Sequence, residues 1–298
     1  MRNWSIARRA WNTFFNSRLG ERIFFLHMPK CGGTSLDNAL KYCYLDLRPS
    51  SSAGVVRYDS LAAAKAGVLV DSLDYASGAA REPQVLAFSE RFTAYHMHRE
   101  RTRYISGHIS FNEKIHAAFS DRFRYVTVLR DPVQHLLSAY FYVKHRSSDH
   151  GRITAELDDF IDSPHARSFG SMFVQFLCGQ GSSAGVDFCS ADMVERAKRN
   201  LEKFDLVGVL EDMDGFMRAF HARFGRRLWV RQKNRSPAPQ SRRNSRLSDA
   251  DMEKLRALCA PNMAIYAHAR KIIADGYNVP LGGGRLVEQN GAAAAPRR

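Results

Sequence analysis

An apolar run that leads directly into a glycine-containing turn constrains this sequence most. Residues Ile23 to Met28 suit a buried strand, and the turn follows from Pro29 to Ser35. Apolar residues then recur at the spacing of one helix face, at Leu36, Ala39, Leu40, Cys43 and Leu47. The chain therefore contains a predicted strand, glycine loop and helix in direct succession, which is a typical opening unit of an α/β fold.

Further apolar strands alternate with helical patterns along the chain. Strands are predicted at Arg103–His108, Tyr125–Leu129 and Leu206–Leu210. Helices are predicted after Asp131 and Pro132, near 154–162 and 166–178, at Met193–Phe204, after a capping box of Ser248 with Asp251, and at Ile265–Ile273. This alternation predicts an α/β fold with a central parallel sheet flanked by helices.

The expected domain organisation is one domain that contains an insertion and has a segment before it and a tail after it. Residues 21–280 form the single predicted domain, and 1–20 form a basic amphipathic segment in front of it. Residues 48–100 are expected to be a variable, peripheral insertion, because the stretch to about residue 90 is rich in Ser, Ala and Gly, with one short helix around Leu61–Val68. Residues 281–298, with their runs of Gly and Ala, are expected to be a disordered tail.

The glycine loop has the composition of an anion cradle. Lys30, Cys31, Gly32, Gly33, Thr34 and Ser35 combine a cation, flexible backbone amides, two hydroxyls and the start of a helix. A nucleoside triphosphatase loop is disfavoured, because there the lysine follows the glycines and directly precedes the hydroxyl residue. The remaining interpretations are a phosphate or sulfate site, or a plain turn without a ligand.

Two other predicted strands also end in chemically capable residues. Gly107 and His108 end one, and Arg130 and Asp131 follow another. In parallel sheets ligands bind beyond the carboxyl ends of the strands. The active cleft is therefore expected where these two ends meet the Lys30–Ser35 loop.

These segments resemble known motifs. His27-Met28-Pro29-Lys30-Cys31-Gly32-Gly33-Thr34-Ser35-Leu36 resembles the 5′-phosphosulfate loop of sulfotransferases that use 3′-phosphoadenosine-5′-phosphosulfate (PAPS). It is most similar to the carbohydrate branch that contains heparan sulfate 2-O-sulfotransferase. Val128-Leu129-Arg130-Asp131-Pro132, with Ser138-Ala139-Tyr140 downstream, resembles the family's 3′-phosphate motif, and Tyr104-Ile105-Ser106-Gly107-His108 resembles the strand end that carries its catalytic histidine.

The resemblance implies a P-loop-like, three-layer α/β fold and transfer of a sulfuryl group to an acceptor hydroxyl, on a carbohydrate. Lys30, the amides of Cys31, Gly32 and Gly33, Thr34 and Ser35 would hold the 5′-phosphosulfate, while Arg130 and Ser138 would hold the 3′-phosphate. Lys30 would also neutralise charge on the leaving nucleotide, and His108 would remove the acceptor proton. The scheme requires no metal ion.

The histidines leave two alternatives open. His108 has the chemistry of a general base at neutral pH, yet a structural histidine at a strand end fits the same pattern. Some carbohydrate members carry His-Gly-His where this chain has Ser106-Gly107-His108, which makes His108 the sole candidate base there and leaves the acceptor contacts open. His96 and His98 have strand spacing and are expected to flank a strand, since no acid or cysteine lies at metal-ligand spacing.

The charge excess is local. The formal net charge is +14, and its basic blocks are residues 1–20, 221–246 and the last two residues. An anionic partner is implied. Nucleic acid is disfavoured, because few aromatic residues accompany the 221–246 block. The block is either a solvated basic surface or, as the resemblance implies for Lys233-Asn234-Arg235-Ser236, part of a loop that closes over the cofactor. Other arginines would attract an acidic acceptor, and the acceptor glycan is expected to be acidic or neutral.

Cysteine spacing and hydropathy indicate the cellular compartment. The five cysteines are widely spaced and odd in number, which favours a reducing compartment and hence the cytoplasm. No apolar run is long enough to cross a bilayer. The N-terminal segment has helical amphipathicity, so it is either an interfacial membrane helix or a helix packed on its own domain. The main competing function is a non-catalytic protein that binds polyanions or nucleic acid.

Overall fold

A five-stranded parallel sheet forms the centre of the molecule. The computed structural model describes residues 19–44, 54–73, 83–145, 153–179, 186–230 and 248–277. The strands are β1 (Arg22–Leu26), β2 (Val55–Tyr58), β3 (Tyr104–Gly107), β4 (Phe123–Leu129) and β5 (Leu206–Val209), in the order β2-β3-β1-β4-β5. Each neighbouring pair is parallel, which confirms the predicted fold class.

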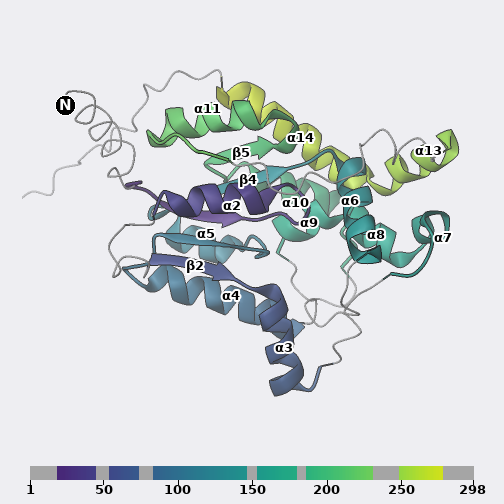
Figure 1. Cartoon of the computed structure of the whole chain (residues 1–298), viewed down its shortest axis with the longest axis horizontal. Helices are drawn as coiled ribbons and strands as arrows, with labels where there is room; N and C mark the ends of the chain where they lie inside the picture. The colour runs from purple at the N-terminus through teal and green to yellow at the C-terminus, as the bar shows by residue number, and fades with distance from the viewer. Residues whose placement is uncertain are drawn as a thin grey trace, which may run out of the picture.

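Helices cover both faces of the sheet, so the molecule has three layers (Figure 1). The described helices are α2 (Gly33–Tyr42), α3 (Ser60–Asp71), α4 (Pro83–His98), α5 (Glu113–Phe119), α6 (Pro132–Lys144), α7 (Leu157–Ile161), α8 (Pro164–Gly170), α9 (Met172–Leu177), α10 (Ala191–Leu201), the 3-10 turn η3 (Leu210–Asp212), α11 (Met213–Phe224), α13 (Asp249–Leu258) and α14 (Ala260–Tyr277).

The alternation of strand side chains divides the core into two clusters. Ile23 and Phe25 of β1 pack with α2 and α11, whereas Phe24 and Leu26 pack on the opposite face among α5, α6, α9 and α10. Because both faces are covered, β1 is apolar in consecutive positions rather than in every second one. This explains why the opening run of the sequence is continuously apolar.

The segment predicted to be a peripheral insertion contributes to the sheet. The expected short helix is present as α3, but the preceding residues form β2, whose Val55 lies opposite Tyr104 of β3. Residues 83–98 form α4, so His96 and His98 lie on a helix and the expectation that they flank a strand is wrong. A four-residue strand in a sequence rich in small residues carries too little periodicity to be recognised.

The region after α6 also differs from the prediction. Instead of two helices near 154–162 and 166–178, three short helices, α7, α8 and α9, follow one another. The Ser163 side chain caps α8 by accepting a hydrogen bond from the amide of Ala166, and Pro164 occupies its first turn. These local signals divide what hydrophobic spacing alone treats as longer helices.

Several predictions fall on residues that the structure does not describe. They concern residues 1–18 of the amphipathic segment, the Lys233–Ser236 part of the basic block and the tail at 281–298. Among the described helices, none combines the length and the apolar character that a membrane span requires.

Candidate active site

The glycine loop joins β1 to α2 through two residues in left-handed backbone conformation. Lys30 has φ 59°, and Gly32, the residue that caps α2, has φ 73°. A Cβ on Gly32 would lie 2.5 Å from Cδ1 of Leu210, and one on Gly33 would overlap the ring of His27. Crowding therefore disfavours a side chain at both positions, and at Gly32 the left-handed backbone favours glycine as well.

The order of the strands brings the predicted site residues together. β1 lies between β3 and β4, so the loop after β1 has the residues after β3 on one side and those after β4 on the other. Arg130 Nη1 donates a hydrogen bond to the carbonyl oxygen of Lys30 at 3.2 Å. On the other side, Nδ1 of His108 lies 2.7 Å from the carbonyl oxygen of His27. The three strand ends that were expected to meet therefore lie next to one another in the fold.

Lys30 is half-buried beside a second cation. Desolvation lowers the pKa of its ammonium group, and the charge of Arg130 lowers it further. Its Nζ lies 3.8 Å from the ring centroid of Tyr142, a cation–π contact with an exposed ring of α6. Two neighbouring cations repel each other, so an anion placed between them would be strongly favoured.

His108 is held in one tautomer. A carbonyl oxygen only accepts hydrogen bonds, so Nδ1 of His108 carries the proton and Nε2 carries the lone pair. The side chain is accessible to solvent, yet the dense protein around it desolvates the imidazolium and lowers the pKa of His108 below its usual value. The ring is therefore neutral at neutral pH and presents a basic nitrogen.

The other predicted cofactor-binding residues differ in their exposure to solvent. Thr34 is exposed and Ser35 half-buried in the first turn of α2, and Ser138 is half-buried about two turns into α6. The Cys31 side chain is buried, which raises the pKa of its thiol well above its usual value. The Cys31 amide donates to the carbonyl oxygen of Met28 at 3.4 Å, so it already has a partner in the loop.

Sequence reasoning missed side chains whose hydrogen bonds hold the glycine loop and the turn after β4 in place. Nε2 of the fully buried His135 lies 3.1 Å from the carbonyl oxygen of Pro29 and donates to it. Glu211, which follows β5, accepts from the amide of Asp131 at 3.0 Å and from the Tyr266 hydroxyl at 3.0 Å. The only sequence signal for His135 is a polar residue inside the apolar stripe of α6.

A buried polar cluster lies beside the histidine. Asp37 of α2 has no exposed side-chain surface; it accepts a hydrogen bond from the Tyr104 hydroxyl at 2.7 Å and forms an ion pair with Arg57 of β2 at 2.8 Å. Arg57 lies opposite Ser106, and nearly half of its side chain is exposed. Arg57 therefore provides a partly accessible cation on the strand adjacent to the one that ends at His108.

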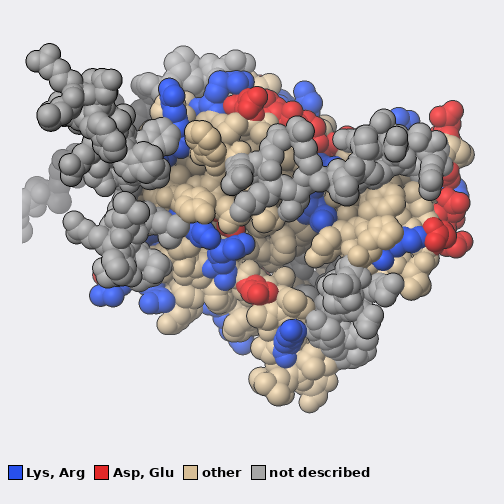
Figure 2. Space-filling view, viewed as in Figure 1, with Lys and Arg blue, Asp and Glu red and all other residues tan. Residues whose placement is uncertain are grey.

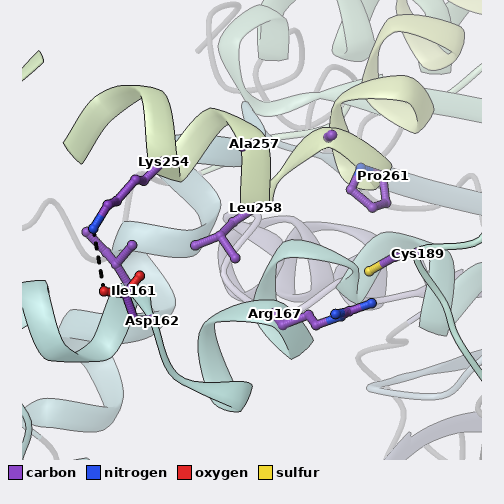
Figure 3. Close-up of a pocket in the computed structure, with 9 residues that line it drawn as sticks. Ile161, Asp162, Arg167, Cys189, Lys254, Ala257, Leu258 and Pro261 are labelled. Atoms are coloured by element: carbon purple, nitrogen blue, oxygen red, sulfur yellow. Dashed lines mark hydrogen bonds and ion pairs between the residues drawn. The ribbon is translucent and has the colours of Figure 1, made fainter. Parts of the chain in front are cut away.

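The described surface also contains a separate cleft of roughly 480 Å³ (Figure 3). Its lining comes from helices α7, α8, α13 and α14 and the loop before α10, and includes Arg167, Cys189 and Lys254. Lys254 forms an ion pair with Asp162 across one end of this cleft. None of its lining residues belongs to the candidate site at the ends of β1, β3 and β4.

Charges of both signs share the face shown in Figure 2. Lys and Arg side chains are scattered over its middle and its upper edge, while Asp and Glu side chains gather along the upper edge, near α11 and α14, and at the end that carries α7 and α13. On the described part of this face, basic residues do not form a continuous stripe. A nucleic-acid backbone would require such a stripe along its path.

Comparison with known families decides the class of protein. A model of the sulfotransferase family matches residues 15–258. The chain belongs to the sulfotransferase family. A search of curated proteins finds no match. The family match spans all five strands of the sheet together with the glycine loop, His108 and Arg130. Within the described residues, no three His, Cys, Asp or Glu side chains are grouped as a metal site.

Proposed function

We propose that this sulfotransferase moves a sulfuryl group from PAPS to an acceptor hydroxyl, on a carbohydrate. The observation that carries the proposal is the junction of three strand ends, at which Arg130 contacts the Lys30 carbonyl and His108 is tied to the His27 carbonyl. This junction combines an anion cradle and a general base on adjacent strands. Sulfuryl transfer, like phosphoryl transfer, needs mainly such positioning and charge stabilisation.

The loop fits a phosphosulfate group. Gly32 is exposed and caps α2 without a side-chain hydrogen bond, so the amides at the start of this helix are available to an anion. Lys30 would hold the 5′-phosphosulfate together with Thr34, Ser35 and the amides of Gly32 and Gly33. Arg130 and Ser138 would hold the 3′-phosphate, for which a planar guanidinium is well suited. When bound, PAPS supplies the activated sulfuryl group.

Two side chains of the protein would carry out the remaining steps, which are proton removal and charge neutralisation. Nε2 of His108 would take the proton from the acceptor hydroxyl, because its lone pair is available while Nδ1 stays bonded to the His27 carbonyl. Lys30 would neutralise negative charge that grows on the departing nucleotide. The Cys31 amide is assigned no direct role, since it already bonds within the loop.

The acceptor is proposed to be a glycan, acidic or neutral. The carbohydrate class rests on the resemblance of the loop to carbohydrate sulfotransferases. An acidic glycan is supported by Arg57, whose half-exposed guanidinium lies on the strand beside the one that ends at His108. Residues 48–100 and 144–170 are proposed to shape the acceptor pocket.

The proposal is tested by incubating the protein with labelled PAPS and a mixture of glycans. Lys30→Ala and His108→Ala are each expected to lower kcat/KM for sulfuryl transfer by about 10²–10⁴-fold, since each removes charge stabilisation or proton transfer. Lys271→Ala on α14 and His221→Ala on α11 are matched controls on exposed helix positions outside the proposed acceptor segments, and both should transfer at the parent rate. Equal transfer by all five proteins would contradict these assignments.

The competing polyanion-binding function is separated by a thermal-shift assay. The spent nucleotide, 3′-phosphoadenosine-5′-phosphate, should raise the Tm of the parent and raise that of Arg130→Ala much less. Tight, steeply salt-dependent binding to DNA without any nucleotide-induced shift would favour the competing function instead.

A further inference from the structure

His27 occupies the position that joins the two halves of the proposed site. It directly follows β1, and its amide donates to the Gly107 carbonyl oxygen at 3.1 Å. Its own carbonyl oxygen accepts from Nδ1 of His108 at 2.7 Å. The backbone of one residue therefore fixes the end of β3 and the tautomer of the base that follows it.

The side chain of His27 fills the space between the base and the donor loop. Its ring centroid lies 4.6 Å from that of His108, with 49° between the ring planes, and 5.5 Å from that of Phe25. On its other edge the ring lies so close to Gly33 that a Cβ there would overlap it. The ring is 9% exposed, so it has little freedom to move.

The His27 ring is also electrically neutral. Desolvation, followed by the neighbouring His108 and the charge of Arg57, lowers the pKa of His27 to about 3. A charged ring here would repel Lys30 and the imidazolium that His108 becomes when it accepts a proton. A neutral flat ring supports both groups without competing for the proton.

We propose that the His27 side chain is a positioning residue that aligns Nε2 of His108 with the donor loop at Gly33. This inference rests on the proposed function, because the alignment matters only if the base and the loop act in one transfer. It predicts that loss of the ring lowers turnover while the rest of the loop still binds nucleotide. Small displacements of reacting groups are sufficient for large rate losses.

The test compares His27→Ala and His27→Phe in the full chain. His27→Ala is expected to lower kcat by about 10- to 100-fold with little change in the donor KM, because the His108 ring keeps its bond to the residue 27 carbonyl but loses the ring that it packs against. His27→Phe restores a flat uncharged ring and is expected to retain most of the parent's kcat. His116→Ala on α5, which removes a half-buried ring that packs on Phe111 and Tyr125, is the matched control.

A second measurement does not depend on turnover. NMR titration of the His108 ring in the unliganded protein should show a pKa below 6.5 in the parent, since desolvation is its largest cause. In His27→Ala water enters the space, so the pKa of His108 should rise, while Asp37, Lys30 and Arg57, the other charges that act on it, stay unchanged. In His116→Ala it should not move.

The outcomes are distinguishable. Transfer by the parent, with unchanged kcat and an unchanged His108 pKa in His27→Ala, overturns the positioning role alone. An equal loss in His27→Phe and His27→Ala also overturns it, because the imidazole itself would then take part. If the parent neither transfers sulfate nor binds the spent nucleotide, the proposed function fails and this inference fails with it.

Discussion

At the residue scale, the site is shaped by side chains that are small or uncharged as much as by those that react. Gly33 has no Cβ because the His27 ring occupies that space, and Gly32 has none because Leu210 does. His27 and His135 remain neutral behind the loop, since burial holds the pKa of each at about 3. The cationic groups Lys30 and Arg130 are thus supported by neighbours that add no charge.

Gly33→Ala is expected to damage the site by crowding. Because the new methyl group would overlap His27, the loop or the ring must move, at a cost of about 1–3 kcal/mol in the free energy of unfolding. Binding of the spent nucleotide, measured by calorimetry, should weaken by more than about tenfold. Gly276→Ala near the end of α14, where nothing lies within 4 Å, is the control and should leave both quantities nearly unchanged. Unaltered nucleotide affinity in Gly33→Ala would show that the loop tolerates the change.

At the element scale, helix caps set where the functional loops end. The Asp131 side chain accepts from the Gln134 amide at 2.9 Å and Pro132 occupies the first turn, so α6 begins at Pro132, two residues after Arg130. Ser248 and Asp251 form a reciprocal capping box at the start of α13, away from the strand ends. Both caps were predicted from sequence, because capping depends on residues a few positions apart.

These two caps provide a matched pair of variants. Asp131→Ala and Ser248→Ala should each lower the free energy of unfolding by about 1 kcal/mol, measured by urea denaturation. Only Asp131→Ala should also reduce the rise in Tm that the spent nucleotide produces, because it loosens the turn that carries Arg130. The same nucleotide-induced rise in both variants would argue against a link between this cap and the donor site.

What the sequence could not predict has a common physical reason. The strand–loop–helix unit, the strand before Arg130, the Asp131 cap and the Ser248–Asp251 capping box depend on local patterns, and all were predicted. β2 was missed because Val55–Tyr58 is short and gains its place only by pairing with β3. The supporting contacts of His135 with Pro29 and of Glu211 with Asp131 join residues about 80 or more positions apart, so no local spacing could reveal them. The catalytic assignments of His108 and Lys30 remain predictions.

At the scale of the whole molecule, burial in the core determines the protonation state of two histidines. Two histidines, His27 and His135, are held neutral in the core, whereas in the unfolded chain each would titrate near 6.5. Their folded pKa values lie below the unfolded value, so the unfolded state binds more protons as the pH falls. Stability that is fully present above pH 6.5 is therefore lost progressively as the pH falls toward about 3.

Urea unfolding at pH 7 and pH 5.5 measures this loss. The two histidines together should lower the free energy of unfolding by about 2 kcal/mol over that interval. His135→Gln, which keeps an N–H donor for the Pro29 carbonyl, should lose about 1 kcal/mol of this pH dependence, the share that His135 contributes. A pH dependence as steep in His135→Gln as in the parent would mean that His135 is not held neutral by the fold.

The strand order also has a consequence for how the chain is made. Of the described strands, β1 is synthesised first, yet its Phe24 pairs with Ile105 on one side and with Tyr125 on the other. Roughly a hundred residues must leave the ribosome before the central strand has both of its neighbours. Such long-range pairing is slow to form. The Lys30–Ser35 loop, His108 and Arg130 should consequently come together only after β4 has been synthesised. A nascent chain that ends before β4 therefore lacks the proposed donor site and cannot be stabilised by the nucleotide.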